Sequence, residues 1–299
     1  LSPHITKPEI VAPESAHPSF NKAAGYFGLT LVSTPLNSEG LVDLSAYHAA
    51  VTNNTVLMIG SAPSTVLGMV DPISDMASVA FDRKINFHVD ACVGGYFLPF
   101  KEKLGASVPL WDFRVPGVTT ISADLHKFGY TAKGASAIIS RDPEIYRYQV
   151  FDFGPPKRPK GYYETPTIAG SRPGGAIAAA WAVMNYLGEE GYMRLVDQTM
   201  KYIGDFQNRI NSIEGLVVLG KPDMSVFAYT SRTLDIYAIA TGMEDRGWMV
   251  SKDSIPFKAI RFMQSPGHEP YIAGYLNDLE EVVELVVKGK ISARGPEAN

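Results

Sequence analysis

Two polar residues, Asp90 and Lys127, each follow a stretch of sequence that is typical of a buried β-strand. Asp90 ends the apolar segment 86–90, and Lys127 follows the β-branched segment 118–122. A lysine that is surrounded by apolar residues has a lowered pKa, because burial disfavours its ammonium form. The neutral amine is then a nucleophile that can form a Schiff base with a carbonyl compound. A solvated loop lysine is the alternative for Lys127.

This pair of residues matches the needs of one particular cofactor, pyridoxal phosphate. A carboxylate beside its pyridine nitrogen keeps that nitrogen protonated, so the ring can accept electrons from a substrate carbanion. Asp90 and Lys127 supply the carboxylate and the amine, although an aspartate at a strand end can also cap a helix. We predict no metal site, because the histidines His4, His48 and His268 show no metal-ligand spacing.

Four motifs resemble the sphingosine-1-phosphate lyases, which belong to the group II decarboxylase branch of the fold-type I pyridoxal phosphate enzymes. They are HVDACVGG at 88–95, DFRVPGVTTISAD at 112–124, HKFGYTAKG at 126–134 and PTIAGSRPGG at 166–175. The similarity covers nearly the whole chain, in the family's order. An aspartate followed by His-Lys is shared by the whole branch, whereas the last two motifs are more specific to the lyases.

The resemblance implies roles for several residues around the cofactor ring. Lys127 carries the cofactor as a Schiff base, and Asp90 pairs with the ring nitrogen. His17 stacks on one face of the ring, where two flat rings bury apolar area. Cys92 covers the other face, because alternation along a strand would place it on the same side as Asp90. The alternatives are a solvated histidine at a helix start and an ordinary buried cysteine.

Further residues match family positions that hold phosphate groups. His126 and Ser171 correspond to positions that bind the cofactor phosphate, and Gly170 allows close backbone approach. In the family this loop serves the neighbouring subunit's pocket, which implies a homodimer with shared active sites. Lys133 matches the lyase family's lysine for the phosphate of the substrate, which needs a cation of its own. A surface loop and a solvated lysine are the alternatives for Ser171 and Lys133.

Two departures from the family pattern bear on the substrate. The family's upstream Gly-Gly-Thr-Glu-Ser segment, which cradles the cofactor phosphate, does not occur in this chain. In the loop 64–68 the chain has Thr65 where lyases usually have an aromatic-Pro pair. A threonine at this cofactor-binding position is more typical of the decarboxylases.

The resemblance implies a carbon–carbon lyase that acts on a phosphorylated long-chain 2-amino-3-hydroxy base. A retro-aldol step would break the C2–C3 bond and release a long-chain aldehyde and phosphoethanolamine. An amino-acid decarboxylase is the alternative, since it shares Asp90, His126 and Lys127 but does not need Lys133. A catalytically silent homologue that binds pyridoxal phosphate or only forms a scaffold is a third possibility, which intact Asp90 and Lys127 argue against.

Composition limits the other function classes. The 299 residues carry a net charge of −4 with no basic block, which argues against a nucleic acid partner. The single cysteine excludes an intrachain disulfide and favours a reducing, cytoplasmic compartment. We find no stretch of transmembrane length and no signal peptide, which decides nothing about a longer parent protein, and we expect membrane contact through the substrate. Because segment 8–13 already reads as a core strand, we expect the chain to be part of a longer protein.

The elements that must position these residues alternate between strand and helix. This alternation predicts an α/β fold with a mostly parallel sheet sandwiched by helices, the fold-type I architecture, in a large domain 1–190. A small C-terminal α+β domain is expected at 191–299. Ligands bind beyond the carboxyl ends of parallel strands, where Asp90, Lys127 and the loop 61–65 all lie. The expected strands are 10–12, 29–33, 55–60, 86–90, 118–122, 135–140, 216–219, 226–230 and 258–263; the expected helices are 18–25, 44–51, 72–81, 176–187, 192–213, 234–243 and 269–287.

Overall fold

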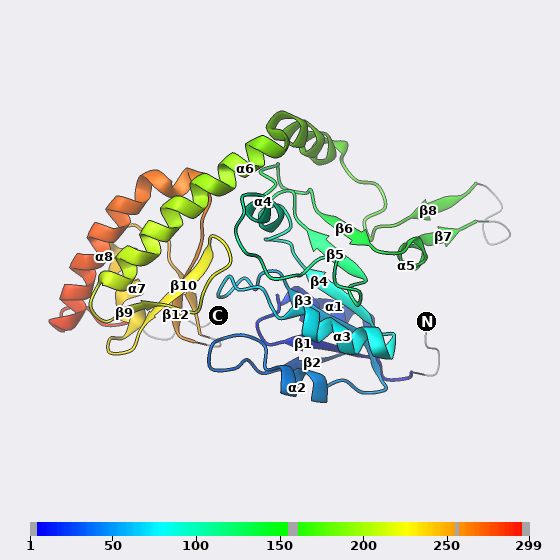
Figure 1. Ribbon diagram of the computed structural model, residues 1–299, viewed down its shortest axis with the longest axis horizontal. Coiled ribbons are helices and arrows are strands. Elements are labelled where there is room, and N and C mark those ends of the chain that lie inside the picture. Colours follow the sequence, from blue (N-terminus) through cyan, green and yellow to red (C-terminus); the bar gives the residue numbers. More distant parts are fainter. Residues whose placement is uncertain (1–4, 155–160, 255–256, 295–299) are drawn as a thin grey trace.

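The computed structural model describes residues 5–154, 161–254 and 257–294. A six-stranded sheet lies at the centre of the larger part, in the order β2-β1-β3-β4-β5-β6 (Figure 1). The first five strands are parallel, and β6 runs antiparallel to β5. This confirms the α/β fold with a mostly parallel sheet. The strands are β1 Glu9–Pro13, β2 Thr30–Thr34, β3 Thr55–Ser61, β4 Asn86–Asp90, β5 Thr120–Ala123 and β6 Ala137–Ser140.

Helices cover both faces of this sheet. Side chains alternate along β1, so Val11 packs in one core with Tyr47 and Met76, whereas Ile10 packs in another core with Ala24. The first core therefore lies under α2 and α3, and the second lies under α1. The helices of this part are α1 Ser19–Phe27, α2 Leu44–Ala49, α3 Ile73–Arg83, α4 Leu98–Lys103 and α5 Pro143–Arg147.

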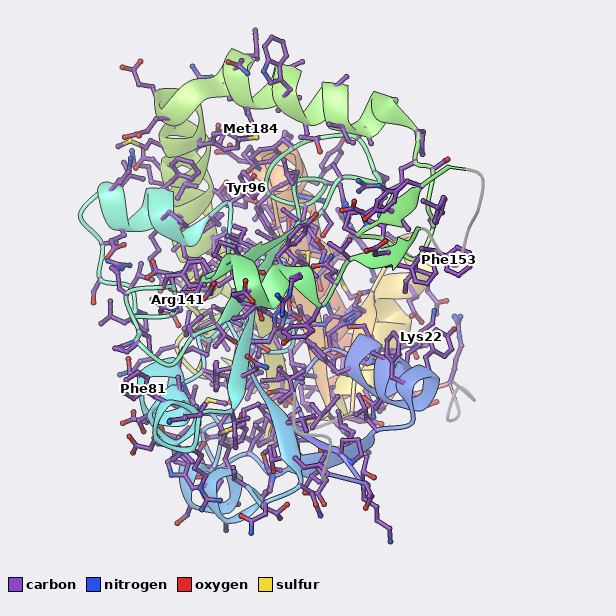
Figure 2. The ribbon with its side chains drawn as sticks, turned by 90° about the vertical axis from the view of Figure 1, so that its right-hand side faces the viewer. Lys22, Phe81, Tyr96, Arg141, Phe153 and Met184 are labelled. Carbon is purple, nitrogen blue, oxygen red and sulfur yellow. The ribbon has the colours of Figure 1, made fainter. Side chains whose placement is uncertain are left out.

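A long helix, α6 (Gly174–Ser212), connects the larger part of the molecule to the C-terminal part (Figure 1). The helix is interrupted at Gly188, whose φ of 57° and ψ of −174° are not helical. Two helical segments were expected here, and the break confirms them. Tyr96, in the turn after β4, donates a hydrogen bond to the sulfur of Met184 on α6 at 3.8 Å (Figure 2). The first half of α6 is therefore fastened to the carboxyl edge of the sheet.

The C-terminal part has its own sheet, in the order β11-β12-β10-β9, and its own apolar core. Aromatic rings of Phe206, Phe227, Phe262 and Tyr275 meet there at centroid distances of 5.1–5.7 Å. The α+β character of this part agrees with the expectation, while the boundary at residue 190 stays a prediction. Its elements are β9 Leu216–Val218, β10 Val226–Ser231, α7 Ile236–Asp245, β11 Ser251–Asp253, β12 Ala259–Met263, the 3-10 helix η1 Pro266–Tyr271 and α8 Ile272–Val287.

Two short strands lie in a part of the chain where no strand was expected. Strands β7 (Phe151–Phe153) and β8 (Tyr163–Thr165) form an antiparallel hairpin that projects from the body of the molecule (Figure 1). Phe153 lies on this hairpin (Figure 2), and its side chain is exposed. The strands are three residues each, too short for a periodic pattern to predict.

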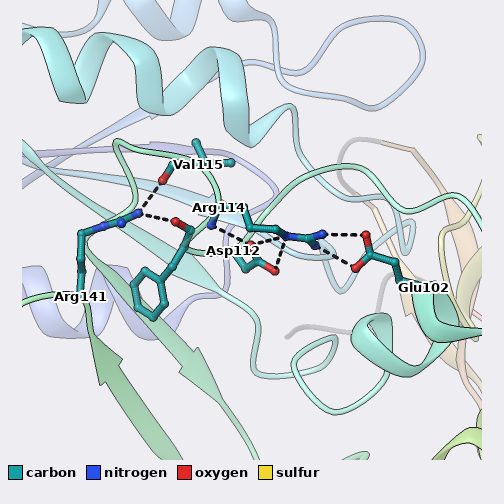
Figure 3. A network of polar contacts seen from close by, with 6 residues as sticks. Glu102, Asp112, Arg114, Val115 and Arg141 are labelled. Atoms are coloured by element: carbon teal, nitrogen blue, oxygen red, sulfur yellow. Dashed lines mark hydrogen bonds and ion pairs between the residues drawn. The ribbon is translucent and has the colours of Figure 1, made fainter.

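An arginine network holds the chain that leads into β5 (Figure 3). Arg114 donates to both carboxylate oxygens of Glu102 at 2.8 and 2.9 Å and to Asp112 at 2.9 Å. Arg141, which follows β6, donates to main-chain carbonyls on the same stretch, those of Phe113, Val115 and Val118. The approach to β5, and hence the position of the residues beyond its end, is fixed from two sides.

Candidate active site

Asp90 lies at the carboxyl end of β4, where one of its carboxylate oxygens is held in place. Oδ1 accepts hydrogen bonds from Cys92 N at 3.1 Å and from Ser122 Oγ at 3.2 Å. Ser122 is the register partner of Asp90 on β5. Oδ2 forms no hydrogen bond with the described part of the chain. The carboxylate is therefore oriented by the protein and keeps one oxygen for a ligand.

The loop after β3, which carries Thr65, packs beside Asp90. Ala62 N donates to Asp90 O at 2.8 Å. A Cβ on Gly94 would lie 2.1 Å from Ala62 O, so only glycine permits this approach of the two strand ends. Thr65 itself is half-buried, and its side chain forms no hydrogen bond with the described residues. The loop thus lies at the expected edge of the sheet.

Two ionisable residues for which no site role was expected lie close enough to Asp90 for its charge to affect their pKa values. Asp71 is fully buried and accepts a hydrogen bond from Ser61 N at 2.7 Å. Burial raises the pKa of Asp71 to about 7, and the nearby Asp90 carboxylate adds to the rise. Burial lowers the pKa of His88, against the opposing effect of Asp90. Nothing in the local pattern around Asp71 distinguishes it from a helix-start aspartate.

Lys127 lies beside a carboxylate that the sequence analysis overlooked. Its Nζ is 2.9 Å from Asp124 Oδ2, and its side chain is 30% exposed. The expectation of purely apolar surroundings is therefore wrong, because the chain turns after β5 and brings residue 124 under residue 127. The spacing Asp-x-x-Lys after a strand was the available signal.

Asp124 also contacts two other residues of the same region. Oδ1 accepts a hydrogen bond from Ser136 Oγ at 2.5 Å, and His126 Nε2 lies 3.6 Å from Oδ2. Burial raises the pKa of Asp124, but the hydrogen bonds from Ser136 and Lys127 outweigh it and lower the pKa. The His126 Nδ1 atom is buried and has no partner within the described ranges.

Cys92 contacts Ser122, but it does not lie on the strand. β4 ends at Asp90, and Cys92 follows in a turn, which corrects the argument from strand alternation. Its Sγ donates to Ser122 Oγ at 3.2 Å, and Asp124 N donates to Cys92 O at 3.2 Å. Burial, with the Asp90 carboxylate nearby, raises the pKa of the Cys92 thiol well above its usual range. Cys92 therefore connects Ser122, which binds Asp90, to Asp124, which lies beside Lys127.

His17 lies just after β1, at the same edge of the sheet. Its ring is exposed, and its Nδ1 lies 2.9 Å from Ser19 Oγ in the first turn of α1. Pro18 is the N-cap residue of α1, so the helix begins one residue after the expected start. A ring fixed at a strand end and open to solvent can face a flat ligand.

Lys133 and Ser171, two of the residues expected to bind phosphate groups, are exposed, whereas His126 and Gly170 are half-buried. Lys133 forms no hydrogen bond or ion pair within residues 5–154, 161–254 and 257–294. Ser171 and Arg172 are also exposed and lie in the loop between β8 and α6. Gly170 has a φ of 53°, and a Cβ there would lie 2.6 Å from the Tyr163 hydroxyl. Only glycine satisfies both conditions at this position.

The carboxyl edge of the sheet therefore carries a carboxylate with a free oxygen, a lysine amine and an imidazole. Within the described residues, no group of three His, Cys, Asp or Glu side chains could hold a metal ion. The part of the chain that the structure describes has no helix long and apolar enough to cross a membrane.

The pyridoxal-dependent decarboxylase conserved domain matches residues 3–231. The chain belongs to this family. Pyridoxal phosphate is its cofactor, and the donor set at the strand ends fits it: Asp90 Oδ2 suits a protonated ring nitrogen, and Lys127 suits an aldehyde.

Several curated members of the family are similar over most of the chain. The sphingosine-1-phosphate lyase of Arabidopsis thaliana is 40% identical over 282 residues, which are 94% of this chain and 51% of the relative. The sphingosine-1-phosphate lyase 1 of Rattus norvegicus is 40% identical over 96% of this chain and 51% of its own. The chain thus spans about half the length of these relatives. A probable L-tyrosine/L-aspartate decarboxylase of Methanothermobacter thermautotrophicus is 33% identical, over 92% of this chain and 75% of its own.

Solved structures agree with the fold. The sphingosine-1-phosphate lyase of Burkholderia pseudomallei superposes with a TM-score of 0.89 and 38% identity, over 94% of this chain and 64% of its own. The glutamate decarboxylase of Lactobacillus brevis reaches a TM-score of 0.82 at 19% identity, over 96% and 68%. The second likeness shows the fold alone, which is the fold-type I architecture expected from the sequence.

Proposed function

We propose that this protein, with pyridoxal phosphate bound, is a carbon–carbon lyase of the sphingosine-1-phosphate lyase type. It cleaves the C2–C3 bond of a phosphorylated long-chain 2-amino-3-hydroxy base and releases a long-chain aldehyde and phosphoethanolamine. The observation that carries the proposal is the 40% identity to curated lyases over 94% of the chain. The geometry of the strand ends supports it, because the required carboxylate ends β4 and the amine lies in the turn after the neighbouring strand β5.

Different residues of the chain would bind different parts of the cofactor. When bound, pyridoxal phosphate accepts the electron pair that bond cleavage leaves on the substrate. Asp90, held by Ser122, keeps a proton on the ring nitrogen through its free Oδ2. Lys127 supplies the amine that binds the cofactor aldehyde. His17 and Cys92 would contact the two faces of the ring, and the neutral Cys92 thiol would add no charge beside it.

Other residues would bind the phosphate groups. His126 would hold the cofactor phosphate together with the partner's Gly170 and Ser171, and Thr65, on the loop after β3, would lie near the ring. Lys133 binds the substrate phosphate, since it is a cation with no partner elsewhere in the described chain.

We also propose a homodimer in which the Gly170–Ser171 loop completes the pocket of the partner. Apolar side chains stand exposed on this side of the chain: Ile168 is 95%, Trp181 70% and Tyr186 88% exposed. Monomers rarely leave such a surface uncovered. The substrate is a lipid, so the active-site entrance would meet membranes through it, and the free Cys92 suits a cytoplasmic location.

A decarboxylase is the second candidate, because Thr65 departs from the lyase pattern and a decarboxylase relative is matched over 75% of its length. The purified protein, loaded with pyridoxal phosphate, should be offered a phosphorylated sphingoid base and, separately, tyrosine, aspartate and glutamate. We expect long-chain aldehyde and phosphoethanolamine from the first and no carbon dioxide from the others. Carbon dioxide release without aldehyde would replace the lyase by the decarboxylase.

A further inference from the structure

Asp124 is the most enclosed charged residue beside the proposed cofactor lysine. Its side chain is 9% exposed, and both of its carboxylate oxygens have partners. Ser136 Oγ donates to Oδ1 at 2.5 Å, and Lys127 Nζ lies 2.9 Å from Oδ2. His126 Nε2, at 3.6 Å from Oδ2, is a weaker neighbour. The carboxylate therefore points at the amine of Lys127, and the hydrogen bond from Ser136 holds it in that orientation.

The charge of Asp124 makes this contact selective for an ammonium ion. Its lowered pKa leaves the carboxylate ionised at neutral pH, although it is buried. Across the strand ends, neither the neutral Cys92 thiol nor the Asp90 side chain can supply a positive charge that balances Asp124. A buried anion without a counter-charge is costly, and Lys127 supplies that counter-charge.

We propose that Asp124 is a positioning residue that holds the Lys127 amine as an ammonium ion whenever this amine is not bonded to the cofactor. The inference rests on the proposed role of Lys127. A substrate that arrives as an ammonium ion would lose two protons when its nitrogen replaced that of Lys127 as the protonated imine. Lys127 would gain two protons on leaving as an ammonium ion, so protons and charge would balance. Asp124 then keeps the displaced amine at the strand end for its return.

A purely structural role for Asp124 has a different signature. The backbone bonds of this turn, from Lys127 N to Asp124 O at 3.3 Å and from Asp124 N to Cys92 O at 3.2 Å, do not involve the carboxylate. The substitution Asp124→Asn keeps these bonds and can still accept from Ser136, but it removes the charge. It therefore separates the ammonium contact from the geometry of the turn.

The test measures the reactivity of single lysines in the full chain stripped of cofactor. A brief pulse of acetic anhydride at pH 7, followed by peptide mass mapping, reports how much free amine each lysine presents. Lys133 lies in the same loop, is exposed and serves as the internal reference. In the wild type, Lys127 should be acetylated severalfold more slowly than Lys133, because its Nζ is engaged by Asp124 at 2.9 Å and its side chain is 30% exposed, whereas Lys133 is exposed.

Asp124→Asn should raise the Lys127-to-Lys133 ratio severalfold, because it removes the ion pair that engages the Lys127 amine. Asp124→Glu, which keeps the charge, should return the ratio toward that of the wild type. Asp197→Asn is the matched control. Its partner Lys201 is 2.6 Å away but 74% exposed, so acetylation of Lys201 should change little.

An unchanged ratio in Asp124→Asn would overturn the inference. If that variant does not fold, the wild-type comparison still decides, because equal acetylation of Lys127 and Lys133 would also overturn it. The measurement uses neither cofactor nor substrate, so its failure is distinct from that of the proposed function. The latter fails when borohydride reduction of the loaded protein labels a lysine other than Lys127.

Discussion

Two groups of proposed site residues differ in how far this chain completes them. The strand-end group, Asp90, Ser122, Asp124 and Lys127, is joined by hydrogen bonds and an ion pair across β4 and β5. The exposed group, Lys133 and the Gly170–Arg172 loop, forms no such contacts with the first group in the described structure. One chain therefore organises the electrostatics around the cofactor ring. The exposed group consists of residues whose partners we place on the substrate and on a second subunit.

The largest effect should come from the strand-end group. Lys127→Ala should lower activity by at least about a thousandfold, because it removes the amine that binds the cofactor. Borohydride reduction of the wild type, followed by peptide mass mapping, should find the pyridoxyl group on Lys127. If the label were found on Lys133, which lies in the same loop, then Lys133 and not Lys127 would bind the cofactor.

An intermediate effect should come from the loop 170–172. A chain with Lys127→Ala and a chain with Ser171→Ala and Arg172→Ala should each be inactive alone. Mixed after dissociation, half of the dimers are hybrids with one intact site, so activity should return to about a quarter of the wild-type level. Two wild-type chains taken through the same procedure serve as the control. If mixing restores nothing, each pocket is built within one chain and the loop has another role.

The smallest effect should come from Lys133. The substitution Lys133→Ala removes one charge-assisted hydrogen bond, worth roughly 1.5–3 kcal/mol, so kcat/KM should fall about ten- to a hundredfold. Cofactor absorbance should stay as in the wild type, because Lys133 does not touch the strand-end group. Normal cleavage of the phosphorylated base by this variant would remove the main argument for a lyase over a decarboxylase.

Much of this could be predicted from the chain alone. Buried parallel strands are runs of apolar residues bounded by turns, and this local pattern located β1, β3 and β4 and therefore Asp90 at a strand end. The two helices expected at 176–187 and 192–213 likewise left a gap that includes Gly188, where α6 is interrupted. The motifs around Lys127 then pointed to the cofactor.

The contacts within the site depended on information that no local pattern carries. The hydrogen bond from Ser122 to Asp90 requires the register of β4 against β5, which is set by packing across the whole sheet. The ion pair between Asp124 and Lys127 depends on a turn that reverses the chain after β5, with Ser136 closing it from the start of β6. Side-chain direction at such turns follows from tertiary packing. The types of the site residues could therefore be predicted from the sequence, whereas the tertiary structure determined which of them pair.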